Sequence, residues 1–182
     1  MRVKVKKIST NAKLPYKKYD SDFCYDLYAT SCEEIAPNVY KYGLGLAFQI
    51  ERDYEKIFDA GGYRPDTTID TSMMPMNFSI DIRPRSSVWK TGMVLSNCEG
   101  TVDELYTGEV SAVFYHVMPN MPKYEVGDRV AQMKIGFTLP VDFVEVDSLD
   151  DTERGCGGYG STGMKETRNT YLDNGRNEKK EG

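Results

Sequence analysis

The chain has 182 residues, of which 40% are hydrophobic and 28% are charged, and its formal net charge is −5 at pH 7. This length fits one globular domain with room for a tail or an insertion, and the acidic balance argues against a general binder of nucleic-acid phosphates. Because no apolar run approaches the roughly 18 residues of a membrane span, and no signal-peptide pattern is visible, we expect a soluble cytoplasmic protein without nucleic-acid or membrane partners.

Short strands make up most of the predicted elements in the N-terminal part. Residues 2–8 alternate charged and apolar side chains, which predicts an edge strand with lysines facing water. Residues 20–30 predict a second strand that carries Asp26 on one face. Residues 39–50 predict a third strand, which the Gly-Leu-Gly sequence at 43–45 interrupts with a bulge or bend.

The middle of the chain starts with a break in this pattern. Residues 52–77 are rich in turn formers and have little periodicity, so we interpret them as an insertion and not as a second domain. A strand resumes at 78–82, and the Pro-Arg-Ser-Ser sequence at 84–87 predicts the start of one short helix. Free N–H groups at a helix N-terminus suit an anion, and the neighbouring Arg83 and Arg85 favour phosphate.

The stretch 97–109 (NCEGTVDELYTGE) lies between two apolar runs at 88–95 and 110–117. This pattern predicts a β-hairpin whose arms start and stop at Gly100 and Gly108, because glycine adopts positive φ angles without steric cost. We expect the rest of the chain to be organised around this hairpin.

Alternation along the hairpin puts Val102 and Asp103 on opposite faces. A carboxylate on a rigid strand beside a tight turn is well placed to orient a water as general base, and Tyr106 adds a flat apolar face with a polar tip. The alternative is a surface aspartate and a packed tyrosine without a chemical role. This stretch alone does not decide between the two.

The histidine and the cysteines argue against two other kinds of site. The single histidine, His116, lies within an apolar run, which favours a packed strand residue over a catalytic base. A Ser-His or Cys-His triad would depend on this one residue, so we set that class aside. Without a Cys-x-x-Cys pair a zinc site is not expected, and reduced thiols are expected at all four cysteines (Cys24, Cys32, Cys98 and Cys156).

The C-terminal part begins with two predicted strands, at 127–135 and 141–146. Many short strands with almost no helical pattern indicate an all-β sandwich, barrel or jelly roll. Residues 154–163 hold five glycines among Arg, Tyr, Ser and Thr. Such a segment cannot build a core, but its N–H groups and hydroxyls can wrap phosphates. The alternative is a flexible tail, and the polar residues 164–182 are expected to be disordered.

Five segments in a fixed order resemble the homotrimeric deoxyuridine triphosphatase (dUTPase) family. They are DLYA at 26–29, PRSS at 84–87, GTVDELYTGE at 100–109, GDRVAQ at 127–132 and RGCGGYGSTG at 154–163. The resemblance implies an all-β jelly-roll barrel (β-clip) with a flexible glycine-rich arm. The implied layout is a barrel domain at 1–151 with an insertion at 52–77, a closing arm at 152–163 and a disordered tail at 164–182.

Members of this family hydrolyse dUTP to dUMP and pyrophosphate with Mg²⁺, which limits uracil in DNA and supplies dUMP for dTMP synthesis. By this resemblance Asp103 orients the attacking water, Tyr106 lies against the deoxyribose, and Asn97 meets the uracil edge together with the backbone at Gly100 and Val102. The resemblance also implies a homotrimer with shared active sites.

The remaining site residues are implied by the other segments. Asp26 resembles the carboxylate that holds Mg²⁺ through water, which suits an ion that keeps several waters. Phosphate contacts are implied for Arg85, Ser86, Ser87 and Gln132. The closing arm would grip the terminal phosphate and cover the uracil, with Arg154, Tyr159, Gly160, Ser161 and Thr162.

Two alternatives stay open. The first is a dCTP deaminase, or a bifunctional enzyme, of the same superfamily, because the Arg-Ser-Ser sequence at 85–87 also occurs in that branch. Lys90 stands where that branch has Arg, and the strand at 110–117 lacks its catalytic Glu. The second is a non-enzymatic regulatory protein on the same fold, which the insertion at 52–77 would favour because loops gain new interactions.

Overall fold

The computed structural model describes residues 2–51 and 77–157. The chain divides into a unit that ends at Val141 and a unit that begins at Asp142.

Three predictions concern residues outside this range. They are the insertion at 52–77 (apart from Asn77, the first residue of a strand), the end of the closing arm and the disordered tail at 164–182.

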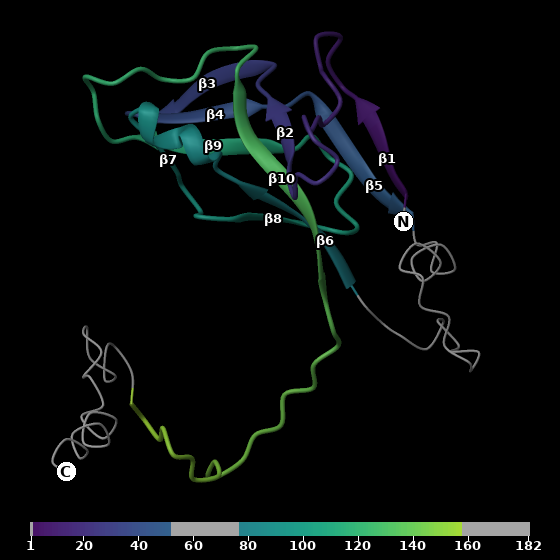
Figure 1. Ribbon diagram of the computed structural model, residues 1–182, viewed down its shortest axis with the longest axis vertical. Helices are drawn as coiled ribbons and strands as arrows, with labels where there is room; N and C mark the ends of the chain where they lie inside the picture. Colours follow the sequence, from purple (N-terminus) through teal and green to yellow (C-terminus); the bar gives the residue numbers. More distant parts are fainter. Residues whose placement is uncertain (1, 52–76, 158–182) are drawn as a thin grey trace, which may run out of the picture. The chain divides into compact units, whose positions relative to one another are not determined.

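Antiparallel strands form three sheets in the first unit (Figure 1). A two-stranded sheet joins β1 (Arg2–Lys7) to β5 (Leu46–Glu51). The second sheet has the order β2-β10-β6-β8, with the bounds Tyr25–Tyr28, Arg129–Thr138, Asn77–Arg83 and Gly100–Asp103. The third has the order β3-β4-β9-β7, with the bounds Ser31–Ala36, Val39–Gly43, Ser111–His116 and Met93–Leu95.

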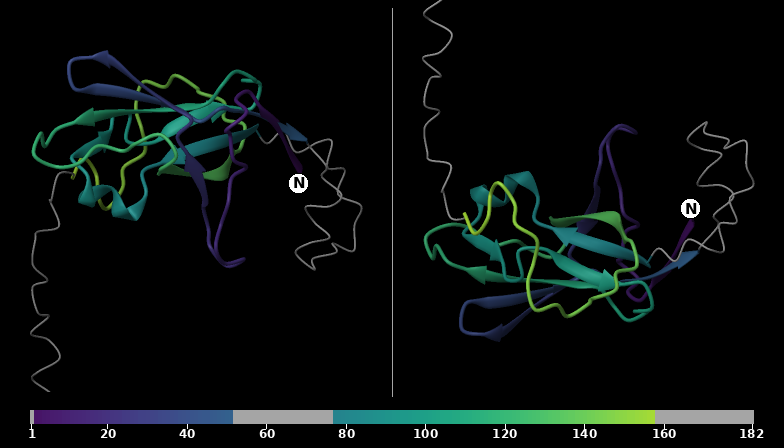
Figure 2. Two further views of the ribbon diagram at one scale, coloured as in Figure 1. Left: turned by 90° about the horizontal axis from the view of Figure 1, so that it is seen from above. Right: turned by 90° about the horizontal axis from the view of Figure 1, so that it is seen from below.

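Apolar side chains from both four-stranded sheets share one core, whose strands Figure 2 shows from two further sides. Its centre is an aromatic cluster of Tyr42, Phe114 and Tyr124, whose rings meet edge to face at centroid distances of 5.6 to 6.1 Å. The Tyr42 hydroxyl donates to the Tyr124 carbonyl at 2.9 Å, which satisfies a polar group that is fully buried. Burial raises the pKa of Tyr42, so this hydroxyl stays protonated and acts as a donor.

The all-β prediction is confirmed, since strands make up nearly all regular structure in the described residues. The predicted strands at 2–8, 20–30, 78–82 and 127–135 correspond to β1, β2, β6 and β10. Among the described residues, the one helix is the 3-10 helix η2 (Ser86–Lys90), and no helix there could span a membrane.

The predicted hairpin between Gly100 and Gly108 is wrong. β8 does begin at Gly100, but it pairs with β6 in the second sheet, while the flanking apolar runs pair as β7 and β9 in the third sheet. The chain therefore crosses from one sheet to the other and back. This crossing lets Val102 pack against the core while Asp103 on the opposite face is exposed, as alternation predicts.

Two other strand predictions also need correction. The stretch 39–50 forms two strands, β4 and β5, in different sheets, because Gly45 with φ 64° turns the chain between them. The stretch 141–146 forms no strand, and Phe143 is 97% exposed. The side-chain pattern of 141–146 alternates like that of a strand, but alternation does not supply a second strand for it to pair with. β3 was not predicted, because its residues are all exposed and form no apolar face.

Candidate functional site

Asp26 on β2 binds two arginines at once. Its Oδ1 accepts from Arg85 Nε at 2.8 Å and its Oδ2 accepts from Arg129 Nη1 at 2.9 Å. The Asp26 side chain is only 19% exposed, so solvent screens these ion pairs weakly. Two cations against one carboxylate leave a local excess of positive charge, which favours an anionic ligand nearby.

Strand register explains why these groups meet. Gln132 on β10 lies opposite Asp26 on β2 and opposite Arg83 on β6, so three strands place their residues in one row. Gln132 Nε2 also donates to the Pro84 carbonyl at 3.0 Å. This bond fixes the backbone immediately before Arg85, while Asp26 fixes the Arg85 side chain.

The predicted short helix is present as η2, with Arg85 in an extended conformation at its N-cap. Arg85 Nη1 donates to Ser87 Oγ at 3.3 Å, and Ser86 is exposed beside it. A 3-10 helix of five residues has little macrodipole, so the expected attraction for an anion rests on the arginines and hydroxyls and not on the helix end.

A second group of residues surrounds a cavity of about 230 Å³ at the end of β8. Val102, Asp103 and Tyr106 line it together with Thr101, Glu109, Val110 and Ser111. The Tyr106 N–H donates to the Asp103 carbonyl at 3.0 Å, which closes a tight turn between these two residues. Among the residues that the structure describes, none donates a hydrogen bond to the Asp103 carboxylate, so this group is free to orient a water.

Asn97 lies next to the start of β8. A Cβ placed on Gly100 would lie 3.1 Å from Asn97 Nδ2, a tight contact that shows how closely the Asn97 amide approaches the backbone at Gly100. The residues predicted to meet a base edge, Asn97, Gly100 and Val102, are therefore neighbours. β8 is also the edge strand of its sheet within the described part of the chain, so part of its backbone faces away from β6.

The two groups lie at opposite ends of β6. Ser79 pairs with Asp103 and Arg83 pairs with Gln132, so the two rows are four residue steps apart along β6. At about 3.3 Å per residue this separation is about 13 Å. One chain therefore does not bring the Asp103 end and the Asp26 end into a single small pocket.

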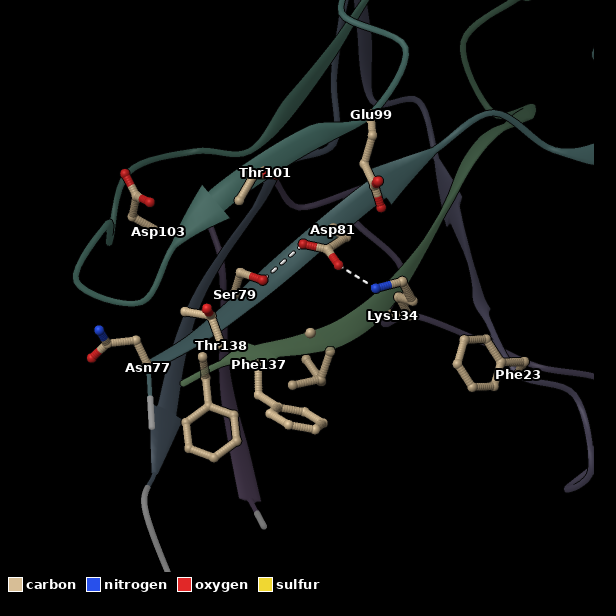
Figure 3. Close-up of a pocket in the computed structure, with 13 residues that line it drawn as sticks. Phe23, Asn77, Ser79, Asp81, Glu99, Thr101, Asp103, Lys134, Phe137 and Thr138 are labelled. Carbon is tan, nitrogen blue, oxygen red and sulfur yellow. Dashed lines mark hydrogen bonds and ion pairs between the residues drawn. The ribbon is translucent and has the colours of Figure 1, made fainter. Parts of the chain in front are cut away.

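A groove of about 600 Å³ lies between these ends along β6, β8 and β10 (Figure 3). Asp103 lies at one end of it and Phe23 at the other, with Asp81 and Lys134 between them. Lys134 Nζ and Ser79 Oγ both bind the Asp81 carboxylate. Burial alone would raise the pKa of Asp81, but these two donors outweigh it and hold the pKa below its usual value.

The second unit contains the only described residue of the predicted arm contacts. Arg154 is exposed, and its Nε donates to the Gly157 carbonyl at 2.9 Å. The other predicted arm residues, Tyr159, Gly160, Ser161 and Thr162, lie outside the described residues.

The described residues contain no cluster of three or more His, Cys, Asp or Glu side chains that could hold a metal ion. Asp26 is the one carboxylate in the cationic group, and each of its oxygens keeps one acceptor position beside its arginine. One carboxylate fits a Mg²⁺ ion that arrives with phosphates and keeps its waters, and it does not fit a cage made by protein alone.

The prediction for His116 agrees with the structure. His116 is half-buried, its Nε2 lies 3.0 Å from the Met121 carbonyl oxygen, and its ring meets Tyr40 edge to face. It is a packed strand residue, and the four cysteines form no disulfide.

Sequence reasoning missed Arg129. This residue was visible only as part of the GDRVAQ segment at the start of a strand, and nothing in its local pattern indicates a bond to Asp26, 103 positions away in the sequence. The contact follows from the pairing of β2 with β10.

Comparison with known proteins gives an independent result. The dUTPase family model matches residues 45–163. The deoxyuridine 5'-triphosphate nucleotidohydrolase of Alkaliphilus metalliredigens is 35% identical over 164 residues, which is 90% of this chain and 98% of that protein. The same-named protein of Helicobacter pylori is 31% identical over 168 residues, with 90% and 98% covered.

Solved structures agree on the fold. The dUTPase of Staphylococcus bacteriophage 80alpha with dUPNHPP has a TM-score of 0.65 at 20% identity, over 90% of this chain and 99% of that one. A mutant dUTPase from phage phi11 of S. aureus, which coordinates a structural Mg(II) ion, has a TM-score of 0.58 at 16% identity, over 83% and 100% of the two chains. With a family model that covers most of the chain and relatives aligned over nearly their whole length, this chain belongs to the dUTPase family.

Proposed function

We propose that this protein hydrolyses dUTP to dUMP and pyrophosphate. The observation that carries the proposal is the carboxylate of Asp103, which lines the same cavity as Tyr106 and is bonded by no other described residue. Asp103 sits on a strand held by β6, so its position is fixed while its oxygens stay available. It accepts a proton from a water and directs that water at the α-phosphorus.

Recognition of the nucleoside falls to the other residues at this end of β6. The Tyr106 ring lies against the deoxyribose and leaves no room for a 2′-hydroxyl. Asn97 and the backbone of the edge strand β8 at Gly100 and Val102 bind the uracil edge. Hydrogen bonds to a base edge discriminate strongly, because a wrong base leaves buried polar groups unpaired.

The phosphates bind at the Asp26 end. Arg85 and the hydroxyls of Ser86 and Ser87 supply donors, and Gln132 contacts the same region while it holds the Pro84 carbonyl. Asp26 keeps Arg85 in place and offsets part of the positive charge. The excess charge that remains suits a triphosphate, which binds arginine in charge-assisted hydrogen bonds.

We assign to Asp26 the further role of holding Mg²⁺ through water, on the oxygen positions that the arginines leave free. The ion would neutralise charge on the triphosphate when it is bound. The structural Mg(II) of the phi11 enzyme gives precedent for the metal in a protein of this fold.

The separation of about 13 Å along β6 favours sites shared between chains. We therefore propose a homotrimer in which Asp103 of one chain acts on phosphates held by Arg85 of another. The exposed apolar side chains of the second unit support contacts with a neighbouring chain, since Phe143 is 97% and Leu149 is 86% exposed. The closing arm (152–163) would complete the site with Arg154, Tyr159, Gly160, Ser161 and Thr162.

The layout that accompanies this proposal is a barrel domain at 1–151 with an insertion at 52–77, followed by the arm and a tail at 164–182. A cytoplasmic location, a supply of dUMP for dTMP synthesis and a limit on uracil in DNA are part of the same proposal.

The direct test is to incubate the purified protein with dUTP, dCTP, dTTP and UTP in Mg²⁺ and to measure pyrophosphate and ammonia. We expect pyrophosphate from dUTP far in excess of the other three nucleotides. Ammonia from dCTP would support the deaminase instead, and no product from any nucleotide would support a regulatory protein.

Shared sites can be tested by mixing variants. At a dUTP concentration well below the weakened affinity of the Arg85→Ala variant, Asp103→Asn and Arg85→Ala trimers should each turn over little substrate. Subunit exchange between them should raise turnover, because some sites then combine an intact Asp103 with an intact Arg85. Light scattering should show a trimer. A mixture that stays inactive after demonstrated exchange would place both residues in one chain's site.

A further inference from the structure

Glu109 connects the Tyr106 turn to a different part of the fold. Its carboxylate Oε1 accepts a hydrogen bond from the Gly45 N–H at 2.9 Å, in the turn between β4 and β5. Gly45 has φ 64°, and a Cβ on Gly43 would come within 2.9 Å of the same oxygen. The Glu109 carboxylate therefore lies against both glycines of this turn and binds Gly45, 64 positions earlier in the chain.

The backbone next to Glu109 is fixed at the same place. The Val110 N–H donates to the Leu46 carbonyl at 2.9 Å, and the Leu44 N–H donates to the Val110 carbonyl at 3.1 Å. Val110 is 3% exposed and belongs to the core. Glu109 is thus fixed by its own side chain, which binds Gly45, and by the backbone bonds of Val110. Together they fix the orientation of the Glu109 carbonyl group.

That carbonyl is the partner of the tyrosine. The Tyr106 hydroxyl donates to the Glu109 carbonyl at 3.0 Å, although the tyrosine is 50% exposed. The ring lies over Gly108, where an added Cβ would come within 2.5 Å of the hydroxyl oxygen and 2.6 Å of Cζ. Any side chain at position 108 would push the ring away.

We propose that Glu109 is a positioning residue for sugar selection, which fixes the Tyr106 ring by anchoring its own backbone to the β4–β5 turn. This inference rests on the function proposed above, in which Tyr106 excludes the 2′-hydroxyl. A half-exposed ring needs such an anchor, because a ring that swings outward opens the space beside the sugar.

The main test compares two substitutions of Glu109 with a matched control. Glu109→Ala removes the acceptor for the Gly45 N–H, whereas Glu109→Gln keeps a carbonyl oxygen in its place. Glu34→Ala is the control, because Glu34 Oε1 accepts in the same way from the Asn38 N–H at 3.0 Å, in the β3–β4 turn. For each variant kcat and KM are measured with dUTP and with UTP.

Glu109→Ala should lower the ratio of kcat/KM for dUTP over UTP by about threefold to tenfold. This is the range expected for loss of the neutral hydrogen bond from the Tyr106 hydroxyl to the Glu109 carbonyl. Most of this change should come from improved use of UTP, and Glu109→Gln and Glu34→Ala should keep the wild-type ratio. A ratio unchanged in Glu109→Ala, or lowered equally in the Glu34 control, would overturn the proposal. Failure of the wild type to hydrolyse dUTP would instead refute the proposed function.

Two further variants separate ring position from folding. Gly108→Ala leaves Glu109 intact but displaces the ring, so it should lower the same ratio. In a Tyr106→Phe background, which lacks the hydroxyl, Glu109→Ala should have little additional effect on the ratio. Calorimetric titration with dUMP and UMP gives a readout that does not depend on turnover, and the preference for dUMP should fall in the same variants. Additive effects in the double variant would contradict the path through the hydroxyl.

Discussion

The two ends of β6 differ in how their charged groups are held. At one end Asp26 binds Arg85 and Arg129, and Gln132 holds the Pro84 carbonyl, so the group is assembled before any ligand arrives. At the other end Asp103 is exposed, and no described residue donates a hydrogen bond to its carboxylate. Donors that must bind a strongly charged ligand gain from being fixed in advance, whereas a general base must keep its oxygens available for water.

The largest expected effect is at the Asp103 end. Asp103→Asn should lower kcat by about a thousandfold or more, because an amide cannot take the proton from water. Nucleotide affinity should change little, since the carboxylate acts in the chemical step. Single-turnover kinetics and calorimetry with a non-hydrolysable dUTP analogue measure the two quantities. Turnover within a few-fold of the wild type would remove Asp103 from its catalytic role.

The Asp26 end should respond mainly in affinity. Arg85→Ala should weaken binding of the triphosphate by about tenfold to a hundredfold, the range of a hydrogen bond to a charged group, and should affect dUMP less. Arg129→Ala should have a smaller effect of the same kind, since its side chain is 46% exposed against 23% for Arg85. Calorimetry with the analogue and with dUMP measures both.

Arg83→Ala is the control for this pair of variants. Arg83 lies two positions before Arg85, but its Nε donates to Glu99 Oε1 at 2.5 Å, outside the Asp26 group. If this variant weakened triphosphate binding as much as Arg85→Ala, the effect would reflect general positive charge and not the arrangement around Asp26.

Much of the fold follows from local patterns, because strand alternation depends on neighbouring residues only. β1, β6 and β10 were predictable for this reason, and so was the exposure of Asp103 opposite Val102. Where a strand pairs depends on distant segments. That is why the hairpin prediction was wrong and why 141–146, with the alternation of a strand, has no strand partner among the described residues.

The candidate site shows the same limit. Its residues were named from five segments in order, but their grouping was not predictable. The bond between Arg129 and Asp26 and the separation of Asp103 from Gln132 both come from the register of β2, β10 and β6. Register is fixed by the whole buried face of a sheet and not by any one segment. The anchor from Glu109 to Gly45 is likewise a contact between elements distant in sequence.

The smallest expected effect on activity concerns Asp81, which lies on β6 midway between the two ends. Lys134→Met should leave kcat and KM nearly unchanged but destabilise the fold by about 2–3 kcal/mol at pH 7, because it leaves a buried carboxylate with Ser79 as its remaining partner. In the wild type the pKa of Asp81 lies below its usual value, so this carboxylate adds stability at neutral pH that is lost as the pH falls through its folded pKa.

Without Lys134, burial should raise the pKa of Asp81, so acid should protonate this carboxyl group and remove the free-energy cost of burying its charge. The stability difference between variant and wild type should therefore shrink from pH 7 to pH 4 in denaturant unfolding. Lys4→Met, which removes an exposed ion pair with Glu51, should change stability little at either pH. A difference that grows on acidification would show that Lys134 does not stabilise the ionised form of Asp81.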